Sequence, residues 1–334
     1  MRHRNAQRLG GCAVFAFFAA CVAGCSGIQS ALDPAGTEAD SVAWLFWIMV
    51  AGGAAIWIGV VALLLYANRS RRRVHSERTA SLLIFWGGAV FPSVVLALLL
   101  GYALWLMPAI RPWAAFAGTP SLRIAVVGEQ FWWRVTYLPA DGRAPVVSAN
   151  EIRLPVGERV EITLESRDVI HSFWIPPLGG KMDMIPGRIN RLSLLATKTG
   201  TFRGPCAEFC GTSHALMAFS AVAMEPAAFD DWLEARSSPS PNVTATGLDA
   251  FLANGCDACH TIKGTEARGE IGPDLSHVGS RETLGAGILP NTDAAIARFI
   301  SEPEEIKPGV KMPAFGMLPP QEIDAIAAYL KGLR

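Results

Sequence analysis

Apolar residues are concentrated near the start of this 334-residue chain. Two apolar runs, at residues 42–66 and 82–107, contain no charged side chain, and each is long enough to cross a bilayer as a helix. The segment between them carries five arginines and one glutamate, and such basic loops stay in the cytoplasm. The pattern predicts a two-helix transmembrane hairpin at residues 40–110, with both ends on the outer side. A buried core helix is the alternative for either run.

The pattern changes after this hairpin to short stretches that are rich in β-branched residues or alternate polar with apolar side chains. Glycine and proline separate these stretches, which lie at residues 122–127, 160–164 and 191–196. The spacing predicts an all-β sandwich or barrel over residues 118–235.

The last part of the chain has a third pattern. Residues 236–246 are rich in serine and proline, which is typical of a linker. Helical spacing follows at residues 247–254 and 320–330, and it predicts a small all-α domain over residues 247–334. The chain is therefore predicted to be a multidomain membrane protein.

Overall composition agrees with membrane spans and gives no sign of a nucleic-acid partner. The mean hydropathy is +0.30, and the formal net charge is zero. Basic residues at positions 2, 4 and 8 precede an apolar stretch at 11–23, which is the pattern of a secretory signal. Residues 22–25 resemble a bacterial lipobox, so we predict removal of a lipoprotein-type signal at 1–24 and a lipid on Cys25. An uncleaved or ordinarily cleaved signal is the alternative.

Two close cysteine pairs remain once the signal and Cys25 are set aside, and an exported chain uses such pairs as disulfides or cofactor sites. The first pair, Cys206 and Cys210, is followed by His214 and Met217, and His171 lies upstream. Thiolate and imidazole together suit copper, with a thioether as a weak axial ligand. A single zinc ion and a disulfide are the alternatives.

The second pair belongs to Cys256-Asp-Ala-Cys259-His260, the attachment pattern for c-type haem with His260 as iron ligand. A disulfide is the alternative. The motifs of residues 247–334 resemble a small class I cytochrome c, which implies Met312 as the distal ligand and Met317 as the second candidate. Arg281 is a candidate for a haem propionate, although exposure at the surface is the commoner role of arginine.

Residues 40–235 closely resemble the CuA type of cytochrome c oxidase subunit II, chiefly through the Cys-x3-Cys-x3-His-x2-Met motif. The resemblance implies a cupredoxin-like barrel that holds a dinuclear copper centre. Cys206 and Cys210 would bridge the two coppers, and His171 and His214 would bind one copper each. Met217 and the carbonyl of Glu208 would be axial ligands. The Glu208 carboxylate would face subunit I and help to bind a magnesium ion there.

The same resemblance implies a function and partners. The chain would pass electrons from its haem c domain through CuA to subunit I, where oxygen is reduced to water. Subunit III would be a further partner, and the donor would be a soluble or membrane cytochrome c or a bc-type complex. The location implied is a bacterial inner membrane, with both termini and the cofactor domains on the periplasmic side.

An aromatic run, Phe131-Trp132-Trp133, resembles the patch where electrons enter subunit II in this family. The family usually has tryptophan at the position of Phe131, and packing in the barrel core is the alternative for each ring. Three other functions are alternatives. A nitrous-oxide reductase would need a large propeller domain, a copper carrier would lack haem, and a quinol oxidase subunit would lack the copper ligands.

Overall fold

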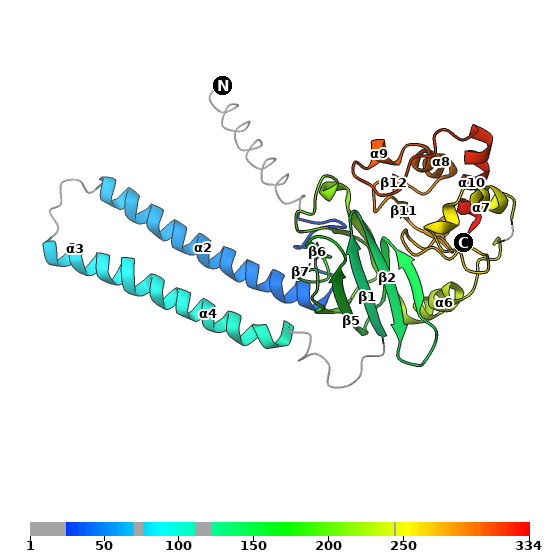
Figure 1. Ribbon diagram of the computed structural model, residues 1–334. Helices are drawn as coiled ribbons and strands as arrows, with labels where there is room; N and C mark the ends of the chain where they lie inside the picture. Colours follow the sequence, from blue (N-terminus) through cyan, green and yellow to red (C-terminus); the bar gives the residue numbers. More distant parts are fainter. Residues whose placement is uncertain (1–24, 70–75, 111–121, 244) are drawn as a thin grey trace, which may run out of the picture. The chain divides into compact units, whose positions relative to one another are not determined.

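A computed structural model describes residues 25–69, 76–110, 122–243 and 245–334 of the chain (Figure 1). The predicted signal peptide and three of the five loop arginines lie outside the described residues. The chain divides after Asp40 and again before Gly118 into two compact units. One unit holds the apolar helices, and the other holds the β domain and the C-terminal helical domain.

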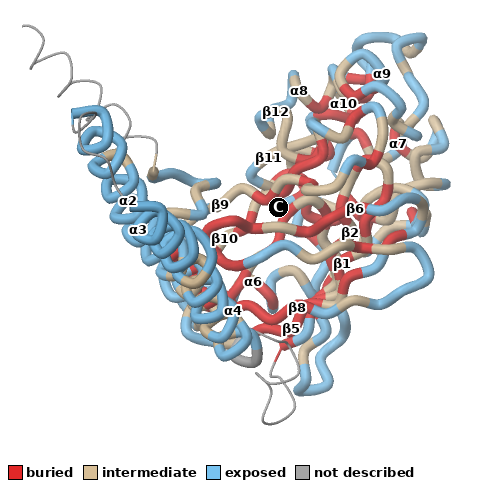
Figure 2. The backbone as a smooth tube through the Cα atoms, turned by 90° about the vertical axis from the view of Figure 1, so that its left-hand side faces the viewer, coloured by how far each residue is buried: buried red, intermediate tan, exposed pale blue. Residues whose placement is uncertain are grey.

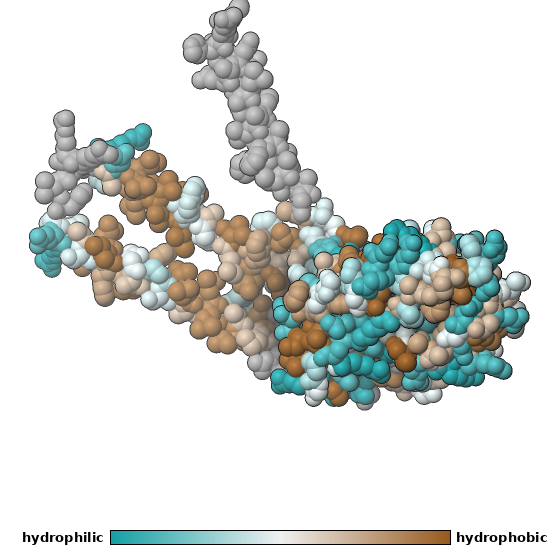
Figure 3. Space-filling model, turned by 45° about the horizontal axis from the view of Figure 1, so that its top comes forward, coloured by the Kyte–Doolittle hydropathy of each residue, from teal (hydrophilic) through white to brown (hydrophobic). Residues whose placement is uncertain are grey.

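The described residues of the apolar unit are helical apart from Ser76, which caps the helix that follows it. Its helices are apolar all round, and none of the residues in the most apolar stretches is buried within the protein, as the brown surface in Figure 3 illustrates. A helix with this surface needs apolar surroundings on every side. Both 37–69 and 77–107 are long enough to cross a membrane, which agrees with the two predicted spans. The helices are α2 (Thr37–Arg69), α3 (Glu77–Leu83), a π-helical segment (Ile84–Val90) and α4 (Phe91–Ile110).

The β domain contains a five-stranded sheet in the order β3-β2-β1-β5-β8 and a three-stranded sheet in the order β4-β10-β9. A short β6-β7 ribbon completes it. Along β1 and β2, buried side chains alternate with less buried ones, as expected when one sheet face is covered. The predicted all-β domain is confirmed. Its strands are β1 (Leu122–Glu129), β2 (Trp132–Pro139), β3 (Val146–Ala149), β4 (Glu151–Pro155), β5 (Arg159–Ser166), β6 (His171–Phe173), β7 (Met182–Met184), β8 (Asn190–Leu195), β9 (Gly200–Pro205) and β10 (Ala218–Met224).

Aromatic side chains from three strands form the centre of the β-domain core. Figure 2 marks the buried residues of these strands, β2, β6 and β10, in red. Phe219 on β10 stacks on Phe173 with ring centroids 4.8 Å apart, and Trp133 on β2 meets Phe219 edge-on at 5.3 Å. All three rings are at most 2% exposed. Gly204 on β9 lies directly opposite Phe219, and the absence of a side chain there leaves room for the ring.

The C-terminal domain packs short helices around its own core. Phe251 and Tyr329 are buried there, with ring centroids 6.3 Å apart. The two predicted helices are confirmed as α7 and α10. The elements beyond the β domain are α6 (Pro226–Ser237), α7 (Leu248–Ala253), η3 (Cys256–Ala258), η4 (Val278–Ser280), β11 (Thr283–Leu284), β12 (Leu289–Pro290), α8 (Asp293–Ser301), α9 (Pro303–Ile306) and α10 (Pro320–Gly332).

The segment that connects the two domains is hydrogen-bonded to the helical domain. The Arg236 guanidinium donates to Ser280 Oγ at 2.8 Å, and Lys263 Nζ donates to the Arg236 carbonyl at 3.1 Å. Farther along, the Asn242 amide donates to the Gly332 carbonyl at 2.9 Å. These bonds limit how far the helical domain can move from the β domain while they persist.

We predict that Gly204→Ala destabilises the β domain. The new Cβ would lie 2.2 Å from the Phe219 ring, which Phe173 and Trp133 hold in place. Overpacking of this kind costs about 1–3 kcal/mol. Thermal unfolding of the detergent-solubilised chain, followed through its tryptophan signals, should show a lower midpoint. Gly180→Ala is the control because no atom lies within 4 Å of its Cβ, and equal midpoints for the two variants would contradict the prediction.

Candidate metal centres

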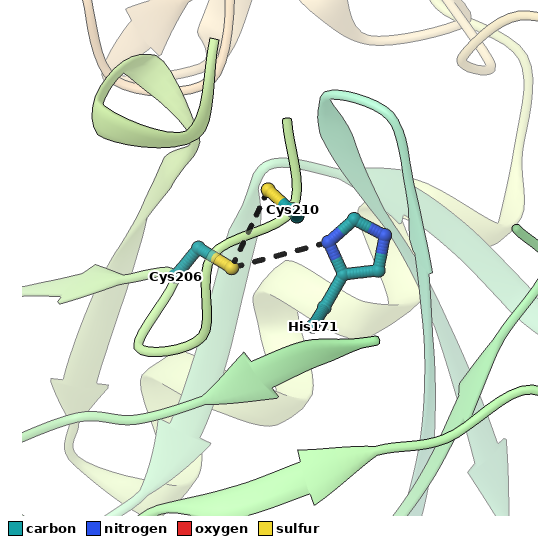
Figure 4. Close-up of side chains that lie close together, drawn as sticks. All are labelled: His171, Cys206 and Cys210. Atoms are coloured by element: carbon teal, nitrogen blue, oxygen red, sulfur yellow. Dashed lines mark hydrogen bonds between the residues drawn. The ribbon is translucent and has the colours of Figure 1, made fainter. Parts of the chain in front are cut away.

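Two cysteines and a histidine meet at one end of the β domain, in a site built from two segments (Figure 4). Cys206 and Cys210 lie in the loop between β9 and β10, and His171 is the first residue of β6. Cys206 Sγ is 3.9 Å from both Cys210 Sγ and His171 Nδ1. All three side chains are buried, and both thiols are free.

The remaining predicted copper ligands lie around the same two sulfurs. His214 Nδ1 is 3.6 Å and Met217 Sδ is 3.8 Å from Cys210 Sγ. The Glu208 carbonyl oxygen is 3.3 Å from Cys206 Sγ. The site thus gathers two thiols, two imidazoles, a thioether and a carbonyl. A structural zinc site has four ligands, so this donor set exceeds what one zinc ion would use and fits a copper pair with two thiolates at its centre.

Asp168, to which the sequence assigned no role, orients one of the histidines. The Nε2 of His171 lies 2.9 Å from an Asp168 carboxylate oxygen, which leaves Nδ1 facing the sulfurs. The backbone amide of Gln130 donates to the other carboxylate oxygen at 2.7 Å. Gly128 makes room for the ring, because a Cβ there would lie 2.8 Å from His171 Cδ2. In the sequence, only the three-residue spacing of Asp168 and His171 indicates that the two side chains could meet.

Electrostatics of the site favour an anionic sulfur next to an imidazole. The hydrogen bond between the two thiols lowers the pKa of Cys206, with a further contribution from His171. The same hydrogen bond raises the pKa of Cys210, and burial and the charge on Cys206 add to this effect. Burial acts to lower the pKa of His171, but hydrogen bonds to Cys206 and Asp168 outweigh it, and the pKa is raised. The anionic sulfur of Cys206 therefore favours the binding of a cation at the cluster.

A cavity of about 500 Å³ lies where the helical domain meets the β domain, and Cys256, Cys259, His260 and Met312 line it. Cys256 begins η3 and Cys259 directly follows it, so the short helix presents both thiols on one wall. Met312 packs against the domain core, whereas Met317 is 78% exposed and does not line the cavity. Met312 is therefore the better placed of the two thioethers.

His260 is held in the orientation that an iron ligand needs. Its Nδ1 donates to the Pro273 carbonyl at 2.7 Å, which leaves Nε2 free to bind metal. Burial lowers the pKa of His260, so the imidazole is neutral at neutral pH. A Cβ on Gly272 would lie 2.5 Å from His260 Cε1, so glycine is required behind the ring. A cavity with two thiols, an oriented imidazole and a thioether fits covalent haem.

The aromatic run divides between two environments. Trp133 is fully buried in the β-domain core, whereas Phe131 and Trp132 line the cavity of the helical domain. Phe131 is 4% exposed, and it lies between the loops of Gly211 and Gly309, where added Cβ atoms would come within 3.2 and 3.3 Å of its ring. Gln130, its neighbour, donates from Nε2 to the Cys210 carbonyl at 2.7 Å.

Comparisons with known proteins assign both domains. Residues 138–224 match the periplasmic domain of cytochrome c oxidase subunit II, and residues 244–334 match cytochrome c. Cytochrome c oxidase subunit 2 of Alkalihalophilus pseudofirmus is 33% identical over 338 residues, which cover 93% of each chain. The chain belongs to the cytochrome c oxidase subunit II family.

Other relatives of this subunit II chain match shorter segments. Cytochrome c oxidase subunit 2 of Bacillus subtilis is 32% identical over 228 residues, which cover 64% of this chain and 63% of that one. Among solved structures, the periplasmic domain of cytochrome oxidase subunit II from Bradyrhizobium japonicum is 33% identical. It covers 36% of this chain and 96% of its own, with a TM-score of 0.33.

Membership of the subunit II family confirms the predicted fold class and the assignment to a terminal oxidase. It also accounts for both groups of metal-binding side chains, since the subunit II domain implies CuA and the cytochrome c domain implies haem c. Cys25 is half-buried, and its carbonyl accepts a hydrogen bond from Ser30 Oγ at 2.7 Å. The attachment of a lipid to Cys25 stays a prediction.

We predict that Asp168→Asn weakens copper binding about 10–100-fold, because it removes the carboxylate that orients His171. Competition with a copper chelator would measure the change in the detergent-solubilised chain. Asp141→Asn is the control. Asp141 is exposed, lies outside the cluster, and forms an ion pair with Arg143 in which nitrogen and oxygen are 2.7 Å apart. Equal copper affinity in the two variants would show that Asp168 does not support the site.

Proposed function

We propose that this subunit relays electrons from its haem c domain through CuA to the oxygen-reducing subunit I of a terminal oxidase. The observation that carries the proposal is the position of Gln130 and Phe131. Both residues line the cavity that contains the haem-attachment motif, and Gln130 is hydrogen-bonded to the backbone of Cys210. A continuous protein path therefore joins the haem cavity to the copper cluster.

Haem c and CuA, when bound, supply the one-electron chemistry, and the protein holds the two groups in a fixed relation. Ser213 Oγ donates to the Pro308 carbonyl at 2.6 Å, which joins the copper loop to the loop that leads to Met312. Lys311 pairs with Asp168 at 3.2 Å. The Arg134 guanidinium donates to the Glu270 carbonyl at 2.8 Å. Transfer within one chain then needs no diffusional encounter between the domains.

The residues proposed to bind each cofactor follow from the geometry of the copper cluster and of the haem cavity. Cys256 and Cys259 attach haem c, with His260 and Met312 as its iron ligands. Phe131 and Trp132 form the patch where electrons reach the copper domain, and Trp133 supports it from the core. The copper ligands proposed are His171, Cys206, Glu208, Cys210, His214 and Met217.

Assembly with subunit I is implied by membership of the family, and we propose subunit III as a further partner. The side chain of Phe209 is 76% exposed between two buried or half-buried copper ligands, Glu208 and Cys210. An exposed phenylalanine at this point is suited to burial against another subunit. We propose that this surface faces subunit I, where the Glu208 carboxylate helps to bind magnesium.

We place the protein in a bacterial inner membrane, with both termini and the cofactor domains on the periplasmic side. The arginine-rich connection between the two apolar helices supports this orientation. The domains proposed are a removable lipoprotein-type signal at 1–24, a membrane hairpin at 40–110, a CuA domain at 118–235, a linker at 236–246 and a haem domain at 247–334.

Flash reduction of haem c in the detergent-solubilised chain tests the relay. Copper reduction should follow with a first-order rate that does not change with protein concentration, because the cofactor sites lie in one compact unit. Cys206→Ser is the control, and it should keep reducible haem c while the mixed-valence copper signal disappears. A rate proportional to protein concentration would mean that transfer takes place between molecules, and the relay within one chain would be abandoned.

The donor, which we propose is a soluble or membrane cytochrome c or a bc-type complex, should be basic or neutral where it docks. Residues 247–334 carry twelve acidic and eight basic side chains, a net charge of −4. Attraction between opposite charges raises the association rate, and salt screens it. The second-order rate of haem c reduction by a basic cytochrome c should therefore fall as ionic strength rises. A rate that is independent of salt would rule out electrostatic steering.

A further inference from the structure

The loop that carries His214 is attached to the haem domain directly before this ligand. Ser213 is fully buried, and its Oγ donates to the Pro308 carbonyl at 2.6 Å. Thr212 faces Gly309, since a Cβ on Gly309 would lie 3.9 Å from Thr212 Cβ. In the described part of the chain, no hydrogen-bond partner meets Nε2 of His214. The backbone of this loop therefore determines where the imidazole lies.

A second contact lies beside Met217, the proposed axial ligand. Ala218 follows Met217 and begins β10, and its backbone N–H donates to the Ala286 carbonyl at 2.9 Å. Ala286 lies in the turn between β11 and β12 of the haem domain and is fully buried. A Cβ on Gly287 would come within 3.2 Å of Ala218 Cβ. The turn therefore packs closely against the start of β10.

The third contact acts on His171 through a carboxylate. Asp168 contacts His171 and pairs with Lys311 of the haem domain at 3.2 Å. Cys206 is held differently, since its backbone N–H donates to the Met217 carbonyl inside the β domain. Both imidazoles and the thioether of the proposed copper site thus touch or adjoin a residue that the haem domain contacts.

These contacts come from a domain that lies beyond the linker, so they are lost whenever the haem domain moves away. Binding of a metal includes the cost of bringing its ligands together, and this cost is smaller when the surrounding protein already holds them. A site whose ligands are correctly placed for only part of the time binds with an affinity reduced by that fraction. Copper should therefore bind more tightly while the three contacts are made.

We propose that the haem domain supports the copper site from outside, so that docking of the haem domain and binding of copper favour each other. The inference rests on the proposed copper site and gives the electron-supplying domain a second role in metal retention. Ser213, Ala218 and Lys311 are positioning residues, because they act on the metal through its ligands. The effect is reciprocal, so copper stabilises the docked domain by the same factor, and such factors are about 5- to 150-fold.

Gly287→Leu tests the proposal from the haem side of the contact, in the full chain purified in detergent. The new side chain would push the turn away from Ala218 without altering any residue of the β domain. Copper affinity, measured by competition with a copper chelator, should fall about 5- to 150-fold. The c-type haem spectrum should stay unchanged, which would show that the haem domain is still folded.

Gly142→Leu is the matched control. Gly142 has a backbone φ of +84°, close to the +83° of Gly287, so leucine meets comparable backbone strain at both positions. No atom lies within 4 Å of a Cβ at Gly142, so no contact is pushed apart there. Equal copper affinity in the two variants, with faster hydrogen exchange at Ala218 in Gly287→Leu, would overturn the proposal. The contact would then be broken without an effect on the metal.

The wild-type chain provides a second test that needs no variant. The backbone N–H of Glu282 donates to the Glu151 carboxylate at 2.9 Å, a contact between the domains that involves no proposed copper ligand. Copper should slow hydrogen exchange in peptides that contain Glu282, as followed by mass spectrometry, because it stabilises docking. Equal exchange with and without copper would refute the linkage. This measurement decides if Gly287→Leu fails to load haem or leaves Ala218 protected.

Failure of the proposed function would be visible separately. The mixed-valence copper signal and the c-type spectrum of the wild-type chain show whether both cofactors bind, and their absence would contradict the relay itself. If both signals are present and copper does not change the exchange of Glu282, the relay stands and only the linkage is rejected.

Discussion

The carboxylate of Asp168 connects the three parts of the molecule on which electron relay depends. It contacts Nε2 of His171, a proposed copper ligand, and accepts from the backbone of Gln130. It also pairs with Lys311, the neighbour of the proposed haem ligand Met312. Burial acts to raise the pKa of Asp168, but the hydrogen bonds outweigh it and the pKa is lowered. The carboxylate is therefore ionised at neutral pH, and one anion supports the copper site, the aromatic patch and the domain contact.

Both sites use the same physical arrangement, in which a glycine and a hydrogen bond fix a histidine. Gly128 and Asp168 orient His171, and Gly272 and the Pro273 carbonyl orient His260. In each case one ring nitrogen is engaged and the other remains available to a metal. Rigid placement of ligands suits electron transfer, because the geometry needs to change little when an electron arrives or leaves.

The position of Phe131 gives a physical reason for the departure from tryptophan at this point of the chain. The ring is enclosed between the copper loop at Gly211 and the haem-domain loop at Gly309, and it is almost completely buried. A larger indole would need more space than the two glycine loops leave. The chain's own second domain covers this aromatic patch.

The sequence by itself determined the spans, the domain order and the chemical types of the ligands, because each follows from local pattern. Apolar length sets a membrane helix, and the Cys-x3-Cys and Cys-x2-Cys-His spacings are local motifs. Only the tertiary structure decided the roles of Asp168 and Gln130, and it separated Trp133 in the core from Phe131 at the contact between domains. These roles depend on distance between segments far apart in the chain, about which hydrophobic periodicity and motif spacing carry no information.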